Sequence, residues 1–482
     1  MKSWGRSMRD LTVLPVLVCI AAFATAAAGT SPTSADARIY ITHVKVVDTE
    51  TGHEAQDRTV VISGDKIVEI RDSKNTTAHV DARVVDGSGK YLIPGLWDMH
   101  VHGTDDESTL GLYVANGVTG VREMFGPPDA NRFRSKLAAK HIVAPHIYLG
   151  SPIVDGNPPV WPKSIVVETP EQGRNAVDAQ KQSGADFIKV YSRLSREAYF
   201  AILAEAKRQN IPVEGHVPIR ITTWEATAAG QKSIEHLMGI GFACSSREKD
   251  LWPNAATTKT MLASDTLEVE AWRTYSHEKC KRLFLEFKKN GSWPVPTLSV
   301  YRTFGLLDDS QFRNDRRLSY FSGEFRDWLA AKDDPRLASW TPADFQLERE
   351  LFRYEEKAVG ELFRGGVPML AGTDTGNPFC FPGFSLHDEL ALLVEAGMSP
   401  LGALQAATRN AALFMDASDR YGSIAVGKMA DLVLLDADPL QDIRNTSKIS
   451  EVFVRGQEFD RTALDQILNT AAELAAKAPA KN

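Results

Sequence analysis

Two histidines near the start of the chain have the spacing of metal ligands. His100 and His102 lie two residues apart in the run Pro94-Gly-Leu-Trp-Asp-Met-His-Val-His-Gly103, and Asp98 has the same parity. In a β-strand, side chains two apart point to the same face, so both imidazoles would face one point that suits a divalent cation. A His pair alone is more often a packing or surface feature. A metal site therefore requires further ligands elsewhere.

Later apolar runs end in residues of the same chemical kind. These are Lys189 in Ala185-Asp-Phe-Ile-Lys-Val-Tyr191, His216 in Ile211-Pro-Val-Glu-Gly-His-Val217, His236 in Ser233-Ile-Glu-His-Leu237 and Asp374 in Met369-Leu-Ala-Gly-Thr-Asp-Thr-Gly376. Singly, each has a structural explanation: a hydrogen-bonded core His, a Lys that reaches solvent, or an Asp in a turn. Together, four His, one Lys and one Asp at strand ends favour one shared site.

The elements that must position these residues are strands alternating with helices. Eight runs have strand character: residues 97–102, 118–124, 146–149, 187–191, 213–217, 233–236, 295–299 and 368–373. Helical periodicity lies between them, for example at Tyr199, Ile202, Leu203 and Ala206. Eight such repeats predict an α/β fold, a (β/α)₈ TIM barrel. In that fold catalytic groups lie at the C-terminal ends of the strands, where all six residues fall.

The two ends of the chain are β-rich and each is too short for its own core. Residues 38–92 and 417–460 therefore predict one small β-sandwich domain built from both ends, flanking a barrel over 93–416 and followed by a helical tail over 461–482. Two spacings, 239–294 and 301–349, exceed one loop plus one helix. We expect them to be insertions over the mouth of the barrel.

The first 28 residues have the layout of a secretory signal peptide. Lys2, Arg6 and Arg9 precede an apolar run, Leu11–Ala28, that ends in small residues. Cys19 raises a lipoprotein alternative, but no small residue precedes it. The prediction is a secreted or periplasmic protein, with periplasm, medium and lipid anchor left open. No later run is long enough to span a bilayer, so no membrane contact is expected after the signal is removed.

Net charge and cysteine content further limit the kinds of protein that this sequence can be. Removing residues 1–28 takes away three positive charges and one negative charge, so the net charge of −7 becomes −9. No basic patch indicates nucleic-acid binding. Three cysteines would remain, Cys244, Cys280 and Cys380, which are too few for a disulfide framework and leave a single bridge open.

The order His-x-His, Lys, His, His, Asp on a barrel with a split β-sandwich resembles the amidohydrolase superfamily. The resemblance runs from about Arg38 to Gly456. The sequence motifs are most similar to one branch of the superfamily, which contains imidazolonepropionase-like enzymes, Xaa-Pro dipeptidases, metallo-carboxypeptidases and ochratoxin-hydrolysing amidases. These motifs are Pro-Gly-Leu-Trp-Asp-Met-His-Val-His, Ser-Ile-Glu-His and Ala-Gly-Thr-Asp. These motifs are specific for the superfamily and poorly specific for the substrate.

The resemblance implies a binuclear metal site. His100 and His102 would hold one ion with Asp374, His216 and His236 would hold a second, and Lys189 would bridge them as a carbamate formed with CO₂. Zinc suits His and carboxylate ligands, with manganese or cobalt open. A metal-bridging hydroxide would attack the carbonyl carbon, and Asp374 would carry its proton to the leaving amine.

The predicted function is hydrolysis of a C–N amide or peptide bond in a small molecule, an N-acyl amino acid or dipeptide. The Lys at position 189 favours this over a mononuclear cyclic-amidine hydrolase or deaminase. A lactone or phosphoester hydrolase on the same site, and a non-catalytic metal-binding scaffold, are the remaining alternatives. Tyr191, Arg193, Arg122 and Tyr301 lie near strand ends and are the candidate substrate contacts, since an Arg can bind a carboxylate in two places. Homo-oligomerisation is left open.

Overall fold

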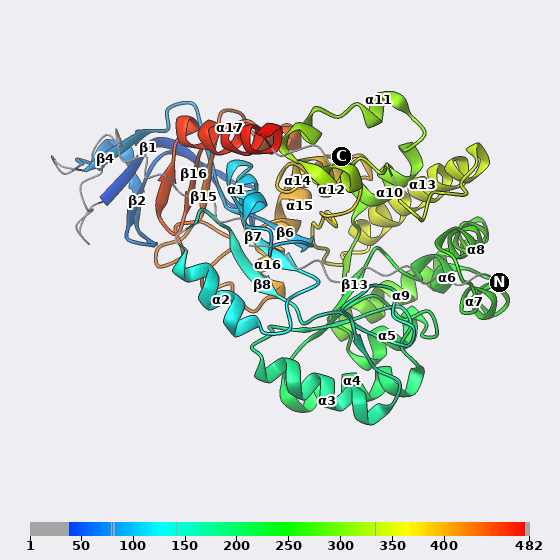
Figure 1. The fold of residues 1–482 in the computed structure, drawn as a ribbon. Coiled ribbons are helices and arrows are strands. Elements are labelled where there is room, and N and C mark those ends of the chain that lie inside the picture. Colours follow the sequence, from blue (N-terminus) through cyan, green and yellow to red (C-terminus); the bar gives the residue numbers. More distant parts are fainter. Residues whose placement is uncertain (1–37, 79, 81, 141, 333, 478–482) are drawn as a thin grey trace.

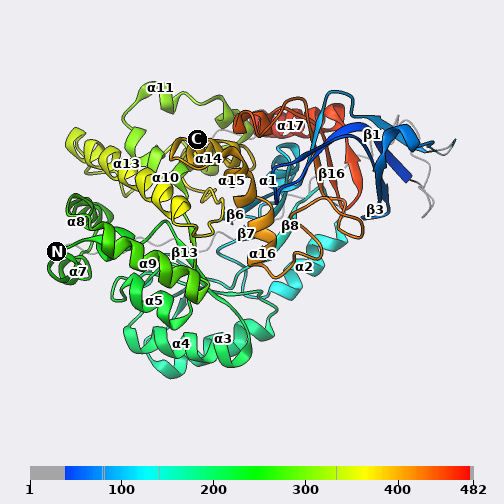
Figure 2. The ribbon, with the colours of Figure 1, turned by 180° about the vertical axis from the view of Figure 1, so that it is seen from behind.

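The computed structural model describes residues 38–78, 80, 82–140, 142–332 and 334–477. The predicted signal peptide lies outside these residues. In the described part of the chain, none of the helices combines the length and the apolar character needed to cross a bilayer. Figures 1 and 2 show a β-rich part at one side of the molecule and a larger part in which helices surround short strands.

The β-rich part is one eight-stranded sheet built from both ends of the chain. Its strands are β1 (Arg38–Val47), β2 (Glu54–Ser63), β3 (Lys66–Asp72), β4 (Arg83–Asp86), β5 (Tyr91–Pro94), β15 (Leu432–Leu435), β16 (Ile449–Val454) and β17 (Gln457–Phe459). The order is β17-β16-β15-β5-β1-β2-β3, with β4 paired to β1. The ends meet where β5 and β15 pair antiparallel, Leu92 opposite Leu434. Both leucines are buried, so this junction is also part of the sheet's apolar core.

Parallel strands form the second part, and most of them are buried. They are β6 (Leu96–Val101), β7 (Val118–Glu123), β8 (His146–Leu149), β9 (Val154–Asp155), β10 (Ile165–Val166), β11 (Ile188–Val190), β12 (Val213–Gly215), β13 (Ser233–Glu235) and β14 (Trp293–Val295). β6, β7 and β8 pair in order, β11 pairs with β12, and β13 pairs with β14. Backbone hydrogen bonds from Ser151 to Phe187 and from Lys232 to Val213 join these groups into one curved wall.

Residues 369–375 complete the ring of strands. This stretch is extended without being a regular strand, which differs from the strand predicted over 368–373. It nevertheless bonds to both neighbours, because Leu370 N donates to Pro294 O, and Met99 N donates to Ala371 O. A Cβ atom on Gly372 would lie 2.8 Å from the Cβ atom of His100, so only glycine allows this close passage.

The seventh strand differs from its prediction over 295–299. The strand is β14, and the chain turns into helix α10 (Leu298–Leu306) two residues later. Thr297 takes a left-handed conformation with φ 50°, and the buried Glu389 carboxylate accepts hydrogen bonds from the N–H groups of Leu298 and Ser299. This distant carboxylate caps the helix, and the local apolar pattern of 295–299 gave no sign of it.

The helices cover the outside of the ring and extend over one end. They are α1 (Glu107–Ala115), α2 (Ala130–Ala139), α3 (Pro170–Gln182), α4 (Arg196–Gln209), α5 (Thr223–Ala229), α6 (Ile240–Cys244), α7 (Glu248–Ala255), α8 (Met261–Arg273), α9 (His277–Asn290), α10, α11 (Ser310–Arg313), α12 (Gly323–Leu329), α13 (Pro342–Arg364), α14 (Phe384–Glu395), α15 (Pro400–Ala406), α16 (Arg409–Phe414) and α17 (Arg461–Lys477), with 3₁₀ turns η1 (Ser73–Asn75), η2 (Arg316–Tyr320) and η3 (Ile443–Ser447). The stripe predicted on α4 is buried.

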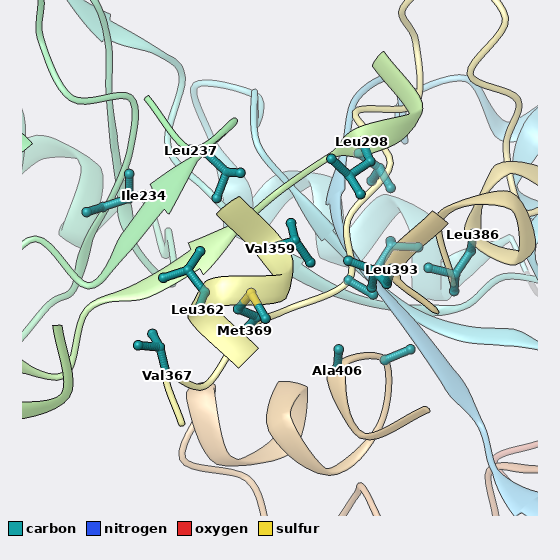
Figure 3. Packing of buried hydrophobic residues seen from close by; sticks show 14 of the residues in the cluster. Ile234, Leu237, Leu298, Val359, Leu362, Val367, Met369, Leu386, Leu393 and Ala406 are labelled. Carbon is teal, nitrogen blue, oxygen red and sulfur yellow. The ribbon is translucent and has the colours of Figure 1, made fainter. Parts of the chain in front are cut away.

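One hydrophobic cluster connects the outer helices to the strands. In Figure 3, Val359 and Leu362 of α13 lie near Ile234 of β13 and Met369 of the closing segment. Leucines of α14 extend the same cluster. Packing on this scale is the main stabilising contribution to the barrel, because each fully buried aliphatic side chain contributes about 1.5–3 kcal/mol.

The two long spacings hold helices that stand beyond the strand ends. Residues 239–294 contain α6 to α9, and residues 301–349 contain most of α10, α11, α12 and the start of α13. A disulfide between Cys244 and Cys280 ties α6 to α9, while Cys380 is buried and unpaired. The bridge that the sequence left open is therefore formed.

Thiol counting tests this assignment. For protein comprising residues 29–482 and unfolded without reductant, we expect one reactive thiol per chain, because only Cys380 is free. Reduction before unfolding should raise the count to three, measured with a chromogenic thiol reagent. A count of three without reductant would contradict the bridge.

Candidate active site

Six polar residues come together at the C-terminal ends of the barrel strands. His100 lies in β6, Lys189 in β11, and His102, His216 and His236 follow β6, β12 and β13. Because the strands run parallel, their ends open on the same side of the ring. Asp374 arrives there from the closing segment, and its N–H donates to His100 O.

The Asp374 carboxylate is the centre of the arrangement. Its Oδ1 lies 3.3 Å from His100 Nε2 and 3.1 Å from His102 Nε2, and its Oδ2 lies 3.8 Å from His236 Nε2. Ligand atoms of His100, His236 and Asp374 all lie within 4.8 Å of one another. His236 and Asp374 both take positive φ angles, 56° and 54°, which are costly for residues other than glycine and persist when the surroundings impose them.

Three imidazoles are oriented by partners on their outer nitrogen. Nδ1 of His100 lies 2.6 Å from Glu235 Oε2, Nδ1 of His216 lies 3.0 Å from Ser192 Oγ, and Nδ1 of His236 lies 2.7 Å from Thr297 Oγ1. The His216 ring also stacks on the Tyr191 ring at 3.8 Å. With Nδ1 engaged by these partners, each Nε2 is left as the atom whose lone pair can bind a metal, which is the usual arrangement for metal-binding histidines.

Lys189 is buried among these groups without a hydrogen-bond partner for its Nζ. Gly215, which has a φ of 128°, makes room for it, since a Cβ atom there would lie 2.9 Å from Lys189 Cδ. Burial lowers the pKa of Lys189 to about 8. A buried, unpaired ammonium is unfavourable, so the site suits a neutral or derivatised amine.

The protonation of the site follows from burial and from Asp374. Burial lowers the pKa values of His100, His216 and His236, which favours the neutral imidazoles that bind metals. Burial also acts to lower the pKa of His102, but hydrogen bonds to Asp374 and Glu123 outweigh it and raise the pKa to about 9. For Asp374, burial raises the pKa, and the surrounding histidines outweigh it and lower the pKa below its usual range.

Arg122 does not contact the space where a substrate would bind. Its guanidinium is fully buried beneath the site, 2.7 Å from Glu214 and 3.0 Å from Glu235, and its Nε donates to Met99 O. We therefore correct the expectation of a substrate contact: Arg122 holds Glu235, which holds His100. A strand-end position alone did not distinguish an inward side chain from one at the mouth.

A cavity of about 1400 Å³ opens over this group, and His102, His216, His236 and Asp374 line it. Tyr191, Arg193 and Tyr301 line it, as expected for substrate contacts, and Trp161 lines it and donates to the Tyr191 hydroxyl. The insertions supply about half of the remaining wall, so they cover part of the mouth of the barrel. The cavity exceeds the usual range of about 300–1,000 Å³ for small-molecule sites.

Four functional positions were missed by the sequence interpretation: Glu235, Ser192, Thr297 and Arg336. Glu235 and Ser192 lie next to or near recognised motif residues, and alternation along β13 could have placed Glu235 on the opposite face from Ile234. Thr297 and Arg336, which lines the cavity and pairs with Asp334, had no local signal.

The comparisons with known proteins agree with this geometry. The amidohydrolase family profile matches residues 326–459. The ochratoxinase of Aspergillus niger is 24% identical over 476 residues, an alignment covering 85% of this chain and 83% of that protein. The chain carries an amidohydrolase family domain. By these likenesses the chain is a hydrolase, similar to the amidohydrolases, which act on C–N amide bonds.

Solved amidohydrolase structures share the fold. Bottromycin amidohydrolase superposes with a TM-score of 0.73 at 25% identity, over 90% of each chain. A Xaa-Pro dipeptidase with bound methionine gives 0.63 at 19% identity, over 88% of this chain and 100% of that one. The A. niger ochratoxinase gives 0.62 at 20% identity, over 89% and 96%. This likeness assigns a TIM-barrel type of fold to the chain.

The donor set fits the divalent metals that amidohydrolases generally use. His100 Nε2, Lys189 Nζ and Asp374 Oδ1 are buried atoms without a hydrogen-bond partner, and ligand atoms of His100, His236 and Asp374 lie within 4.8 Å of one another. Neutral imidazoles and a carboxylate are ligands that zinc and similar ions accept. The residues present therefore fit a metal site.

Thr297 provides a test of how the histidines are held. Thr297→Val removes the Nδ1 partner of His236 while keeping the side-chain shape, so we expect divalent-metal affinity to fall about 10–100-fold. Thr297→Ser keeps the hydroxyl and should retain affinity near that of the wild type. Competition with a chromogenic chelator measures both. Equal affinity for the Val and Ser variants would rule out this positioning role.

Proposed function

We propose that this amidohydrolase is a binuclear metal-dependent enzyme that cleaves the amide or peptide bond of a small N-acyl amino acid or dipeptide. The observation that carries the proposal is that four histidines, Lys189 and Asp374 gather at the strand ends, with the Asp374 carboxylate in contact with three of the histidines. A scaffold without chemistry has no need of that convergence.

The ligands divide into two sets. His100 and His102, which both contact Asp374, would hold one ion with it; His216 and His236, whose rings lie 4.9 Å apart, would hold the other. Lys189 would join the sets as a carbamate, because CO₂ reacts with a neutral amine and the product offers two anionic oxygens. The lowered pKa of Lys189 supports a neutral amine at this position. Zinc is our first choice for both ions, ahead of manganese and cobalt.

When bound, divalent ions would polarise the substrate carbonyl and make a water strongly acidic. The protein's own contribution is proton handling and positioning. Asp374 would accept a proton from the attacking water and release it to the leaving amine nitrogen. Glu235, Ser192 and Thr297 would keep the imidazoles aligned during the reaction.

The cavity wall supports an amino-acid-like substrate. Arg193 and Arg336 line the cavity, and both already have partners, Pro158 O and Asp334. A guanidinium can bind a carboxylate through two parallel hydrogen bonds, which suits the carboxylate of an acylated amino acid. Tyr191 and Tyr301 would pack against the acyl portion.

We further propose that the protein acts outside the cytoplasm, as a secreted or periplasmic enzyme. The leader-like sequence of residues 1–28 and the Cys244–Cys280 disulfide both support an oxidising compartment. The proposed partner is a small-molecule substrate, and the oligomeric state is open.

Metal analysis of Lys189→Ala tests the binuclear site. We expect about two ions per wild-type chain, measured by plasma mass spectrometry after growth with zinc and bicarbonate, and at least one fewer in the variant. Lys207→Ala, which removes an exposed lysine of α4, is the matched control and should keep both ions. One ion per wild-type chain, unchanged in Lys189→Ala, would exclude the carbamate and favour a mononuclear enzyme.

Asp374→Asn tests the proton-transfer role. The amide cannot accept the proton, so kcat on a dipeptide or N-acyl amino acid substrate should fall about 10²–10⁴-fold while much of the metal stays bound. Product release followed by chromatography gives the rate, and metal content is measured on the same sample. A near-wild-type rate would remove Asp374 from the mechanism. If the enzyme hydrolysed lactones or phosphoesters and not amides, the proposed amide substrates would be wrong.

A further inference from the structure

A wall of the same cavity is built from acidic side chains that have no cationic partner. Asp265 and Glu268 of α8 and Glu348 of α13 line the cavity, and Glu355 of α13 lies behind them. Glu348 and Glu355 are buried, Glu268 is 9% exposed and Asp265 is half-buried. Among the described residues, no Lys, Arg or His nitrogen lies within 4.0 Å of these four carboxylates.

The oxygens of this acidic wall, formed by Asp265, Glu268, Glu348 and Glu355, are incompletely satisfied. Trp272 Nε1 donates to Glu355 Oε1, and Asp265 and Glu348 share a hydrogen bond. Glu268 Oε1, Glu348 Oε1 and Glu355 Oε2 are buried without a hydrogen-bond partner. Leaving buried polar atoms unpaired is costly, so their retention in a cavity wall indicates that something else satisfies them.

Burial and mutual repulsion hold these carboxyl groups partly protonated. Burial raises the pKa of Glu268 to about 8, with Asp265 adding to the shift, and burial raises the pKa of Glu348 to about 7. The wall is therefore poised near neutral pH, where an arriving positive charge stabilises the ionised form.

The spacing of these oxygens favours an organic cation over a metal ion. In the described part of the chain, one group of three possible metal ligands has its ligand atoms within 4.8 Å of one another, and it consists of His100, His236 and Asp374. The acidic wall does not bring three carboxylates that close. An ammonium or guanidinium has several separated N–H donors, and it can engage carboxylates that stand further apart.

The acidic wall is one side chain away from the candidate metal site. Tyr301 lies between them, since its hydroxyl donates to His236 O and all four carboxylates act on its phenol. Trp340 also lines the cavity, and an aromatic face adds a favourable interaction with a cation; the neighbouring Phe304 ring is already covered by the Arg336 guanidinium, 4.9 Å from its centre. Lys259 also lines the cavity, but it is exposed and forms no ion pair with the wall.

We propose that Asp265, Glu268 and Glu348 form a subsite for a positively charged group of the substrate, an alkylammonium or guanidinium such as a lysine or arginine side chain. The inference rests on the proposed function for the reaction it serves, and it narrows the substrate to a cationic amide. Binding of the cation is separable from hydrolysis, so the two proposals can fail independently.

The test measures binding of a molecule that has no amide bond to cleave. L-Lysine and L-2-aminoheptanoate differ in one respect, because a methyl group replaces the side-chain ammonium. By isothermal titration calorimetry on the metal-loaded protein, we expect lysine to bind at least about 10-fold more tightly, and arginine to share the preference. Equal affinity for lysine and 2-aminoheptanoate would overturn the subsite whether or not amides are hydrolysed.

Charge-neutral variants locate the effect. Glu268→Gln and Glu348→Gln should each reduce the lysine preference, and the double variant should bring it within about threefold. Glu270→Gln is the control: it removes a carboxylate from the same helix, but Glu270 pairs with Arg247 outside the cavity and its side chain is 44% exposed. A preference that persists in both single variants would overturn the proposal. Thermal unfolding and circular dichroism of each variant confirm that it is folded, and a misfolded double variant leaves the two single variants as the test.

Discussion

The passage of residues 369–375 between β14 and β6 is the constraint on which the site depends. Asp98 accepts hydrogen bonds from the N–H and hydroxyl of Thr373, and this fastens the segment to β6. Asp374 comes next and is delivered to the two histidines of β6. The glycine at 372 permits the contact, and the positive φ of Asp374 is the local cost of aiming its carboxylate inward. The same contacts therefore close the ring of strands and bring Asp374 to the histidines.

Below that site, the buried Arg122 of β7 connects its strand to β12 and β13. Arg122 is fully enclosed, and its charge is matched by Glu214 and Glu235 from β12 and β13. Removing one partner from a buried ion pair typically costs about 3–5 kcal/mol, because the remaining charge is left uncompensated. The network thus fixes the relative positions of three strands. Because Glu235 also contacts His100 Nδ1, the network fixes the orientation of the His100 ring as well. A substrate-facing arginine would have none of these contacts.

How far the sequence could predict the molecule depends on how local each signal was. The ligand positions were predictable because parallel strands end on one side and each motif residue sits at such an end. The seventh strand was placed too late because the stop signal, Glu389, is nearly a hundred residues away. Arg122 was misplaced because burial is a property of the folded barrel. The acidic wall was invisible for the same reason, since its members lie on α8 and α13, which meet only in the folded chain.

The pairing of β5 with β15 has a consequence for how the chain is made. β5 pairs with residues 432–435, so during synthesis it lacks this neighbour until more than three hundred further residues have been added. Contacts of this sequence separation slow folding, and the unpaired edge of β5 exposes backbone donors and acceptors in the meantime. Completion of the sheet is therefore a late step, and loss of β15 would leave one edge of β5 without a partner.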